Sequence, residues 1–122
     1  ACRKKICSLL KKGGAFAVAM DVDAAGLPFF EKIMQPPAGS KSVEELAEIV
    51  KAAGIPFIVK GVMTVRGALK AHAAGAAAII VSNHGGRVLD QCSATAEVLE
   101  EICHAVGGGH ESTCRRRYPQ RR

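Results

Sequence analysis

The stretch PFIVKGVMTVRGALKAHAAGAAAIIVSNHGGR, residues 56–87, predicts the fold of this chain. It begins with a short apolar run, Pro56 to Gly61, and reaches a second apolar run at Ala76 to Ser82. Between the two runs, Thr64 is placed to cap a helix and Gly75 is placed to end it. Two apolar strands joined by a helix form a right-handed βαβ unit, so a parallel sheet is predicted.

The same pattern extends on both sides of this unit. Upstream, Gly14 to Asp21 is a third apolar run, and a helix is expected over Val43 to Ala53, where Ser42 and Glu45 form a capping box. Downstream, a helix that opens at Thr95 has one apolar face, made of Val98, Leu99, Ile102 and Val106. The strands are apolar on both faces, which is typical of strands buried on both sides. The chain is therefore predicted to be an α/β protein with three strand–helix units.

Composition and charge limit the possible functions. The chain has 122 residues, of which 48% are hydrophobic, and no stretch is long and apolar enough to span a membrane. The net charge of +6 resides mainly in residues 109–122, which hold five arginines; the remainder has 12 basic and 10 acidic residues. Because one aromatic residue, Tyr118, accompanies these arginines and no folded motif lies beside them, we expect neither nucleic acid nor a membrane as partner.

The five cysteines predict neither a metal site nor a disulfide framework. They form no C-x-x-C pair and their number is odd. We therefore expect reduced thiols, no bound metal and a cytoplasmic location.

Each predicted strand ends near a residue that can do chemistry. Asp21 ends the first strand, Lys60 lies at the end of the second, and Ser82-Asn83-His84-Gly85-Gly86-Arg87 follows the third. In parallel α/β folds, the carboxyl ends of the strands converge on the ligand. Taken singly, these residues have plainer explanations: a turn cap, a solvated strand end and a loop histidine. Taken together, they favour a cleft in which a carboxylate, an amine, an imidazole and a guanidinium meet.

Three segments resemble one family of flavoenzymes. VSNHGGRVLD, Val81 to Asp90, resembles the signature of the FMN-dependent α-hydroxy acid oxidases and dehydrogenases, which include glycolate oxidase and lactate oxidase. PFIVKGVMT, Pro56 to Thr64, resembles the preceding flavin-binding strand of that family, and GAFAVAMD resembles the strand before it. The resemblance covers residues 14–108 and implies a fragment of a TIM (β/α)8 barrel, comprising strands 4 to 6.

The resemblance also implies a reaction, a cofactor and residue roles. The reaction is the FMN-dependent oxidation of a small L-2-hydroxy acid, such as lactate or glycolate, to the 2-keto acid. His84 matches the catalytic base, which also binds substrate, and Asp21 matches the aspartate that hydrogen-bonds it. Arg87 would bind the substrate carboxylate, Lys60 would lie by the N1 and O2 edge of the flavin, and Ser82 would contact the flavin ring. Full-length relatives are expected to be homo-oligomers.

Two departures from the family pattern leave the substrate open. The family often has a threonine two residues before the aspartate, and counting from Asp21 this place is Ala19. A second carboxylate-binding arginine commonly follows the aspartate by about seven residues, where this chain has Pro28.

The resemblance divides the chain into three parts. Residues 1–13 would be the end of a preceding helix and residues 14–108 a partial barrel domain, since a complete barrel has eight strands and about 250 residues. For one permitted choice of codons, a one-base shift over His110 to Arg122 reads M-K-V-L-V-D-G-G-I-R-S-G, which resembles the family's seventh strand and phosphate loop. We therefore predict that residues 109–122 are a frameshifted tail and that this truncated chain is inactive.

Two alternatives remain open. One is a related FMN-binding barrel similar to the type 2 isopentenyl diphosphate isomerase, although the order H-G-G-R-x-L-D argues against it. The other is a non-catalytic half-barrel that associates with itself or another chain through its open sheet edges.

Overall fold

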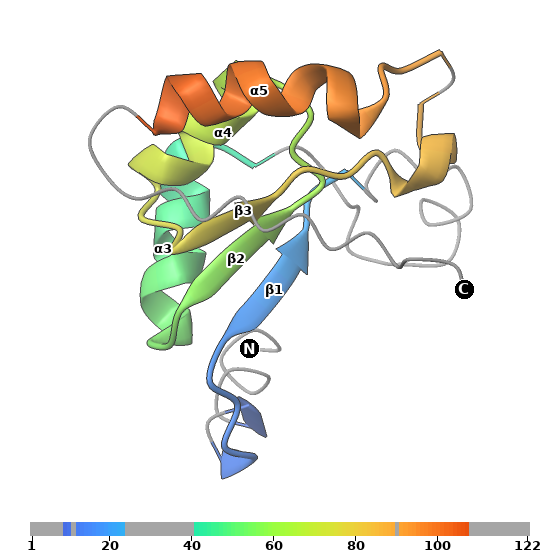
Figure 1. The fold of residues 1–122 in the computed structure, drawn as a ribbon. Helices are drawn as coiled ribbons and strands as arrows, with labels where there is room; N and C mark the ends of the chain where they lie inside the picture. The colour runs from blue at the N-terminus through green and yellow to red at the C-terminus, as the bar shows by residue number, and fades with distance from the viewer. Residues whose placement is uncertain (1–8, 11, 24–40, 90, 108–122) are drawn as a thin grey trace.

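The structure, a computed structural model, describes residues 9–10, 12–23, 41–89 and 91–107, which include a three-stranded parallel sheet (Figure 1). The elements in chain order are β1 (Val18–Asp21), α3 (Val43–Ala53), β2 (Phe57–Lys60), α4 (Val65–Ala73), β3 (Ala78–Ile80), the short 3-10 turn η2 (His84–Gly86) and α5 (Thr95–Val106). Strand β2 is central and hydrogen-bonds to β1 on one edge and to β3 on the other. The predicted strand–helix order and parallel sheet are confirmed.

The strands are shorter than the apolar runs that predicted them. The N–H of Ala76 donates to the carbonyl of Ala71 at 3.1 Å, so the third run begins by closing helix α4. Similarly, the N–H of Ala15 donates to the carbonyl of Leu10 at 3.0 Å, which places the start of the first run in the turn before β1. At these points the apolar runs therefore extend beyond the hydrogen-bonded strands, because their first residues form the end of α4 and the turn before β1.

The helix caps follow the sequence signals. The Ser42 hydroxyl accepts from the N–H of Glu45 at 3.1 Å, and the Glu45 carboxylate accepts from the N–H of Ser42 at 2.9 Å. Gly54 ends α3 in the left-handed conformation, with φ of 60°. The Thr64 hydroxyl accepts from the N–H of Gly67 at 3.1 Å at the start of α4. Such caps stabilise a helix by about 0.5–2 kcal/mol each and fix where it begins.

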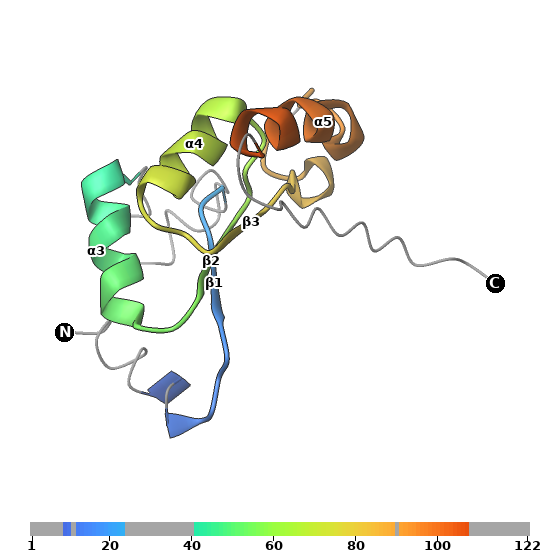
Figure 2. The same ribbon diagram turned by 60° about the vertical axis from the view of Figure 1, so that its left-hand side comes forward.

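The hydrophobic core lies between the sheet and the three helices, all of which cover the same side (Figure 2). Its buried residues come from every layer and are Leu46, Ala53, Phe57, Val59, Val62, Ala68, Ala71, Ala74 and Ile102. Alternate residues of β2 face this core because side chains along a strand point to opposite sides of the sheet.

The other face of the sheet is not covered by any residue that the structure describes. The strand register aligns two rows on it: Ala19, Ile58 and Ala78, then Asp21, Lys60 and Ile80. Ile80 is 41% exposed, although it is a large apolar residue. The prediction that the strands are buried on both sides is therefore wrong for the described part of the chain, because the helices pack on one face only. The second row, Asp21, Lys60 and Ile80, lies at the carboxyl ends of the strands.

Some sequence predictions fall partly or wholly outside the described ranges. Leu9, Leu10 and Lys12 have helical backbone, whereas residues 1–8 and the tail at 109–122 are not described. Pro28, which stands where the family commonly has a second carboxylate-binding arginine, also lies outside the described residues.

Two of the cysteines lie in the part of the chain that the structure describes, and their bonding differs. Cys92 is a free thiol, but Cys103 is disulfide-bonded, so the prediction of reduced thiols is wrong for Cys103. Spacing could not reveal this bond, because disulfide pairing depends on which cysteines meet in the fold.

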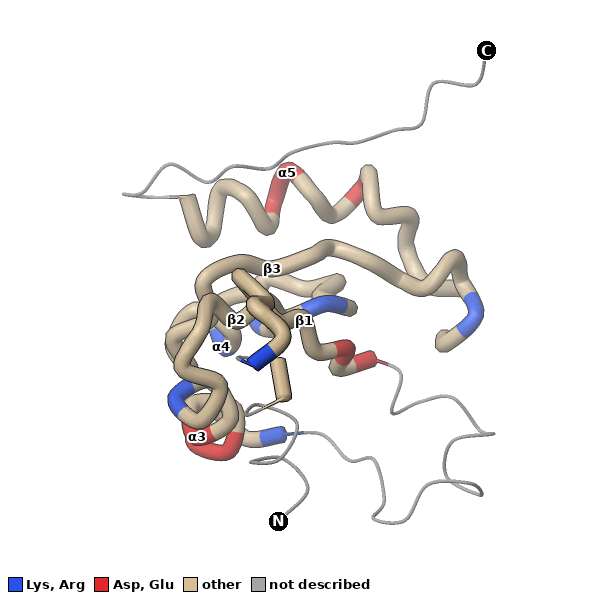
Figure 3. The backbone as a smooth tube through the Cα atoms, turned by 90° about the horizontal axis from the view of Figure 1, so that it is seen from below, with Lys and Arg blue, Asp and Glu red and all other residues tan. Residues whose placement is uncertain are grey.

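Acidic residues lie along α5 and at the start of α3 (Figure 3). Within the described ranges, no helix has the length and apolar character needed to cross a membrane.

Candidate active site

The carboxyl ends of the three strands bring together four polar side chains. Asp21 is the last residue of β1, Asp23 follows it by two residues, Lys60 is the last residue of β2, and His84 begins the turn η2 after β3. The register pairs Asp21 directly with Lys60 across the parallel ladder. The convergence predicted for Asp21, Lys60 and His84 is therefore present, and Asp23 joins them.

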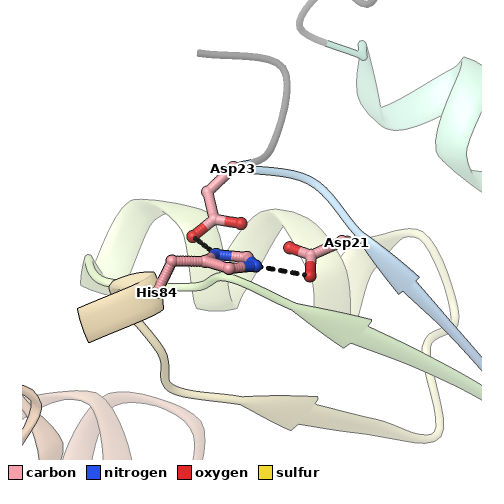
Figure 4. Close-up of side chains that lie close together, drawn as sticks. All are labelled: Asp21, Asp23 and His84. Carbon is pink, nitrogen blue, oxygen red and sulfur yellow. Dashed lines mark hydrogen bonds and ion pairs between the residues drawn. The ribbon is translucent and has the colours of Figure 1, made fainter. Parts of the chain in front are cut away.

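The imidazole of His84 lies between two carboxylates (Figure 4). Its Nδ1 atom lies 2.7 Å from Oδ2 of Asp23, and its Nε2 atom lies 3.0 Å from Oδ2 of Asp21. The side chain of His84 is 22% exposed and that of Asp23 is 16% exposed, so this contact is largely shielded from solvent. Both ring nitrogens are thus held in place by groups from the end of β1.

Lys60 completes the cluster. Its Nζ atom lies 2.7 Å from Oδ2 of Asp21 and 3.0 Å from Nε2 of His84. An ammonium can only donate, so Nε2 accepts from Lys60 when that nitrogen carries no proton. The proton of the neutral ring then resides on Nδ1, where it is donated to Asp23. Nε2 is therefore the ring nitrogen that can take up a further proton.

Burial and charge shift the pKa values of the two aspartates in opposite directions. Burial raises the pKa of Asp21, but hydrogen bonds with Asp23 and Lys60, together with the charges of Lys60 and His84, outweigh it and lower the pKa below its usual 3.8. The pKa of Asp23 is raised above 3.8, first by burial and then by its hydrogen bond with Asp21, although the contact with His84 opposes the rise. Asp21 is consequently the first of the two carboxyl groups to ionise.

Gly61 provides the space that Asp23 occupies. Gly61 has a φ of +91°, and a Cβ atom built on it would lie 2.4 Å from both Cγ and Oδ1 of Asp23. No side chain other than hydrogen fits at this distance. Oδ1 of Asp23 is buried and has no hydrogen-bond partner among the described residues, so packing against Gly61, rather than a second bond, holds that oxygen.

The turn that carries His84 has an unusual backbone. His84, Gly85 and Gly86 are all left-handed, with φ of 54°, 67° and 75°. The Asn83 side chain accepts from the N–H of Gly85 at 3.0 Å, and the Asn83 carbonyl accepts from the N–H of Gly86 at 3.0 Å. The Ser82 hydroxyl accepts from the N–H of His84 at 3.3 Å. Two glycines tolerate this conformation, and the polar side chains before them fix the direction in which His84 points.

Arg87 and Ser82 contact the backbone of His84 rather than its ring. Nε of Arg87 donates to the His84 carbonyl at 2.9 Å, which ties the guanidinium to the histidine turn. Sequence reasoning missed Asp23, which provides the shortest contact to the His84 ring. The available signal was the D-V-D spacing at residues 21–23, which places a second carboxylate just beyond the strand.

The donor atoms of Asp21, Asp23 and His84 lie within 4.8 Å of one another, a spacing that a metal ion could use. Lys60 already places a cation against two of these three groups. We therefore assign no metal to the cluster.

Comparison with known proteins identifies the family. Residues 5–113 match the FMN-dependent dehydrogenase family. This chain belongs to that family. The family is named for its dependence on FMN, and structures similar to this chain include a mandelate oxidase with an FMN adduct.

The family relatives of this chain are oxidases of 2-hydroxy acids by name. A peroxisomal (S)-2-hydroxyacid oxidase of Arabidopsis thaliana is 52% identical over 68 residues, which are 56% of this chain and 18% of the relative. An L-lactate oxidase of Lactobacillus jensenii is 48% identical over 64 residues, 52% of this chain and 16% of the relative. The chain thus spans less than a fifth of the length of these relatives.

Solved structures of the family have the same arrangement of elements. A lactate oxidase from Pediococcus acidilactici superposes with a TM-score of 0.72 and 31% identity, over 86% of this chain and 35% of the oxidase. A mandelate oxidase superposes with a TM-score of 0.71 and 28% identity, over 87% of this chain and 36% of that enzyme. These neighbours are TIM barrels, so the three strand–helix units correspond to part of such a barrel.

Proposed function

We propose that this segment supplies the proton-transfer centre of an FMN-dependent oxidation of a small L-2-hydroxy acid to its 2-keto acid. The observation that carries the proposal is the position of His84, whose Nδ1 lies 2.7 Å from Asp23 while Nε2 faces the strand ends. The names of the relatives, which include lactate, (S)-2-hydroxy acid and 4-hydroxymandelate oxidases, support the substrate class.

In this proposal His84 is the catalytic base and acts through Nε2. Because Asp23 accepts a hydrogen bond from the N–H at Nδ1, the ring keeps one tautomer and presents a lone pair at Nε2. When Nε2 takes a proton from the substrate, the adjacent carboxylate stabilises the imidazolium that results. We therefore assign the orienting role to Asp23. Asp21, to which the sequence resemblance gave that role, contacts Nε2 instead.

The described residues fit FMN. The uncovered face of the sheet offers an apolar surface of Ala19, Ile58, Ala78 and Ile80 beside the Lys60 ammonium. A cation at this place suits the N1 and O2 edge of the flavin, which becomes negative on reduction. FMN, when bound, accepts the two electrons that leave the substrate. Ser82 lies two residues beyond the end of β3, and we propose that it contacts the flavin ring.

Arg87 is proposed to bind the substrate carboxylate. Its Nε donates a hydrogen bond to the His84 carbonyl, so the planar guanidinium extends from the same turn as the base. A fork of N–H groups at that place can grip a carboxylate at two points, while the neighbouring Nε2 receives the hydroxyl proton. Because both residues lie on one turn, a carboxylate bound by Arg87 would be held at a fixed distance from Nε2 of His84, and the α-carbon and its hydroxyl with it.

We further propose that the three strands are the fourth, fifth and sixth of the barrel. The chain covers 35% of the Pediococcus lactate oxidase, and the uncovered sheet face needs further chain to enclose a flavin. By itself the 122-residue chain is therefore expected to bind FMN weakly and to oxidise no hydroxy acid at a measurable rate. An isomerase-like role is less favoured, because the relatives cited here are named as oxidases.

The test uses two proteins: the 122-residue chain, and a hybrid in which residues 14–108 replace the superposed segment of the Pediococcus lactate oxidase. The hybrid is expected to purify with about one FMN per chain and to be reduced by L-lactate or glycolate. His84→Ala should slow flavin reduction by about 10²–10⁴-fold, the usual contribution of a general base, with FMN retained. His104→Ala, at an exposed position of α5, is the matched control and should be unaffected.

A flavin-loaded hybrid that His84→Ala leaves at the parent rate would contradict the proposal. Stoichiometric FMN with turnover in the 122-residue chain would contradict the proposed need for further strands. Size-exclusion chromatography of the same samples tests the self-associating half-barrel, which predicts a flavin-free oligomer.

A further inference from the structure

We propose that Asp21 tunes the charge of this site, by cancelling the charge that Lys60 offers to an anionic group at the strand ends. The inference rests on the proposed function for the identity of that anion, the reduced flavin edge. The charge pairing itself rests on the geometry of this chain alone.

The pairing is direct and is determined by the fold. Nζ of Lys60 lies 2.7 Å from Oδ2 of Asp21, and the two residues are register partners in adjacent parallel strands. Both side chains are 30% exposed, so solvent screens the pair only in part. Because the two Cα atoms are held by the ladder, the carboxylate does not depend on a mobile loop to reach the ammonium.

The contact with His84 extends the effect to the base. Oδ2 of Asp21 lies 3.0 Å from Nε2 of His84, and Lys60 lies 3.0 Å from the same atom. The cluster thus contains one permanent cation and two carboxyl groups. Without Asp21 its charge would be +1 when Asp23 is protonated and zero when Asp23 is ionised; with Asp21 ionised these values become zero and −1. With the His84 ring neutral, Asp21 therefore lowers the charge of the strand ends by one unit and makes them less attractive to an anion.

Asp23 contacts Nδ1 of His84, so we match Asp23, rather than Asp21, to the family aspartate that hydrogen-bonds the histidine. This match shifts the comparison with the family by two residues. The place where the family often has a threonine, two residues before the aspartate, then falls on Asp21 rather than on Ala19. A hydroxyl at that place would leave the Lys60 charge uncompensated. Asp21 is therefore a charged substitution at a place where the family often has a neutral side chain.

The pairing is tested first on the 122-residue chain without flavin. Carboxyl ¹³C NMR should give Asp21 a pKa below 3.8, in line with the lowering that its partners cause. Lys60→Met should raise the pKa of Asp21, whereas Lys70→Met, on the exposed side of α4, should not. An Asp21 pKa that does not respond to Lys60→Met would overturn the inference, whether or not FMN binds.

The effect on an anion is tested on the flavin-loaded hybrid, with sulfite as the probe. The sulfur of sulfite forms a bond to flavin N5, and the electron pair displaced into the ring resides at the N1 and O2 edge. Asp21→Asn should lower the sulfite dissociation constant about tenfold or more, because the uncompensated ammonium stabilises that charge. Glu44→Gln, at the start of α3, is the control and should change it less than twofold.

The double variant separates charge tuning from other effects of Asp21→Asn. In a Lys60→Met background the substitution of Asp21 should tighten sulfite binding less, because it then relieves only the direct repulsion between the carboxylate and the anion and frees no ammonium. An equal gain in both backgrounds, or no gain in either, would overturn the inference. A hybrid that binds no FMN, with the NMR coupling intact, would instead count against the proposed function and leave the charge pairing supported.

Discussion

The imidazole of His84 and the carboxylate of Asp23 meet at 2.7 Å, although 60 residues separate them in the chain. Asp23 comes from the end of β1 and His84 from the turn after β3, on opposite edges of the sheet. The contact crosses the carboxyl end of β2, where Gly61 leaves room for it. Three separate elements are therefore needed to set one proton-transfer geometry.

Replacing Asp23 by asparagine should impair the base without removing its support. An amide oxygen still accepts from Nδ1, but it carries no charge to stabilise the imidazolium. In the flavin-loaded hybrid, Asp23→Asn is expected to slow flavin reduction by roughly 10²-fold or more, as measured by anaerobic stopped flow. Glu100→Gln, an exposed neutralisation on α5, should leave the rate unchanged. A fall of less than threefold for Asp23→Asn would show that the charge of Asp23 does not assist the base.

Replacing Gly61 by alanine should displace Asp23. The new methyl group would lie 2.4 Å from Cγ and Oδ1 of that residue, and the φ of +91° is itself strained for alanine. Backbone strain of this kind costs about 1–3 kcal/mol, and the clash adds to it. Gly14→Ala is the matched control, because Gly14 has a φ of +70° but nothing within 4 Å of the built Cβ. We expect urea unfolding to show a larger loss of stability for Gly61→Ala, and NMR of the His84 ring to change in that variant alone.

Arg87→Lys should act on substrate binding. Lysine keeps the charge but cannot reproduce the planar fork, so one of two charge-assisted hydrogen bonds is lost. Such bonds contribute about 1.5–3 kcal/mol each, and the KM for L-lactate in the hybrid should therefore rise by roughly 10–100-fold. Flavin content should not change. Arg66→Lys, at an exposed position of α4, is the control. A KM equal to that of the parent would remove Arg87 from the proposed substrate site.

Stability in acid should depend on Asp21. The pKa of Asp21 is lowered in the folded chain, so the stability it contributes is present above 3.8 and is lost as pH falls through the folded value. Asp23 has a raised pKa, and its contribution has the opposite sign: it is present below 3.8 and lost as pH rises through the folded value. Urea midpoints between pH 7 and pH 3 should therefore fall less steeply for Asp21→Asn than for the unmodified chain. A steeper fall would contradict the assignment.

The elements of the sheet were readable from the sequence because each depends on local pattern. Apolar runs of strand length and the Ser42 and Thr64 caps indicate where strands and helices begin, and the parallel topology follows from their alternation. The meeting of Asp21, Lys60 and His84 followed from topology too, since parallel strands end at one edge.

What the sequence did not show depends on geometry beyond the strand ends. The chain bends after Asp21, so side-chain alternation no longer says where Asp23 points. Three successive left-handed residues from His84 onward turn Arg87 back to the His84 carbonyl, and no periodic pattern predicts that turn. The exposed face of the sheet was missed because apolar strand residues do not reveal which face the helices will cover.

The backbone of His84 has a consequence for how the chain can change. A φ of 54° costs a residue with a side chain about 1–2 kcal/mol relative to a right-handed conformation, whereas glycine adopts it freely. His84→Gly is thus a substitution that relaxes the turn while removing the imidazole. The same glycine would also remove the ring contacts with Asp21, Asp23 and Lys60 and leave the Asp23 carboxylate without its partner, which costs about 1–3 kcal/mol. The strained backbone of His84 is therefore offset by the contacts of its own side chain, so the histidine can be kept at this position without a net loss of stability.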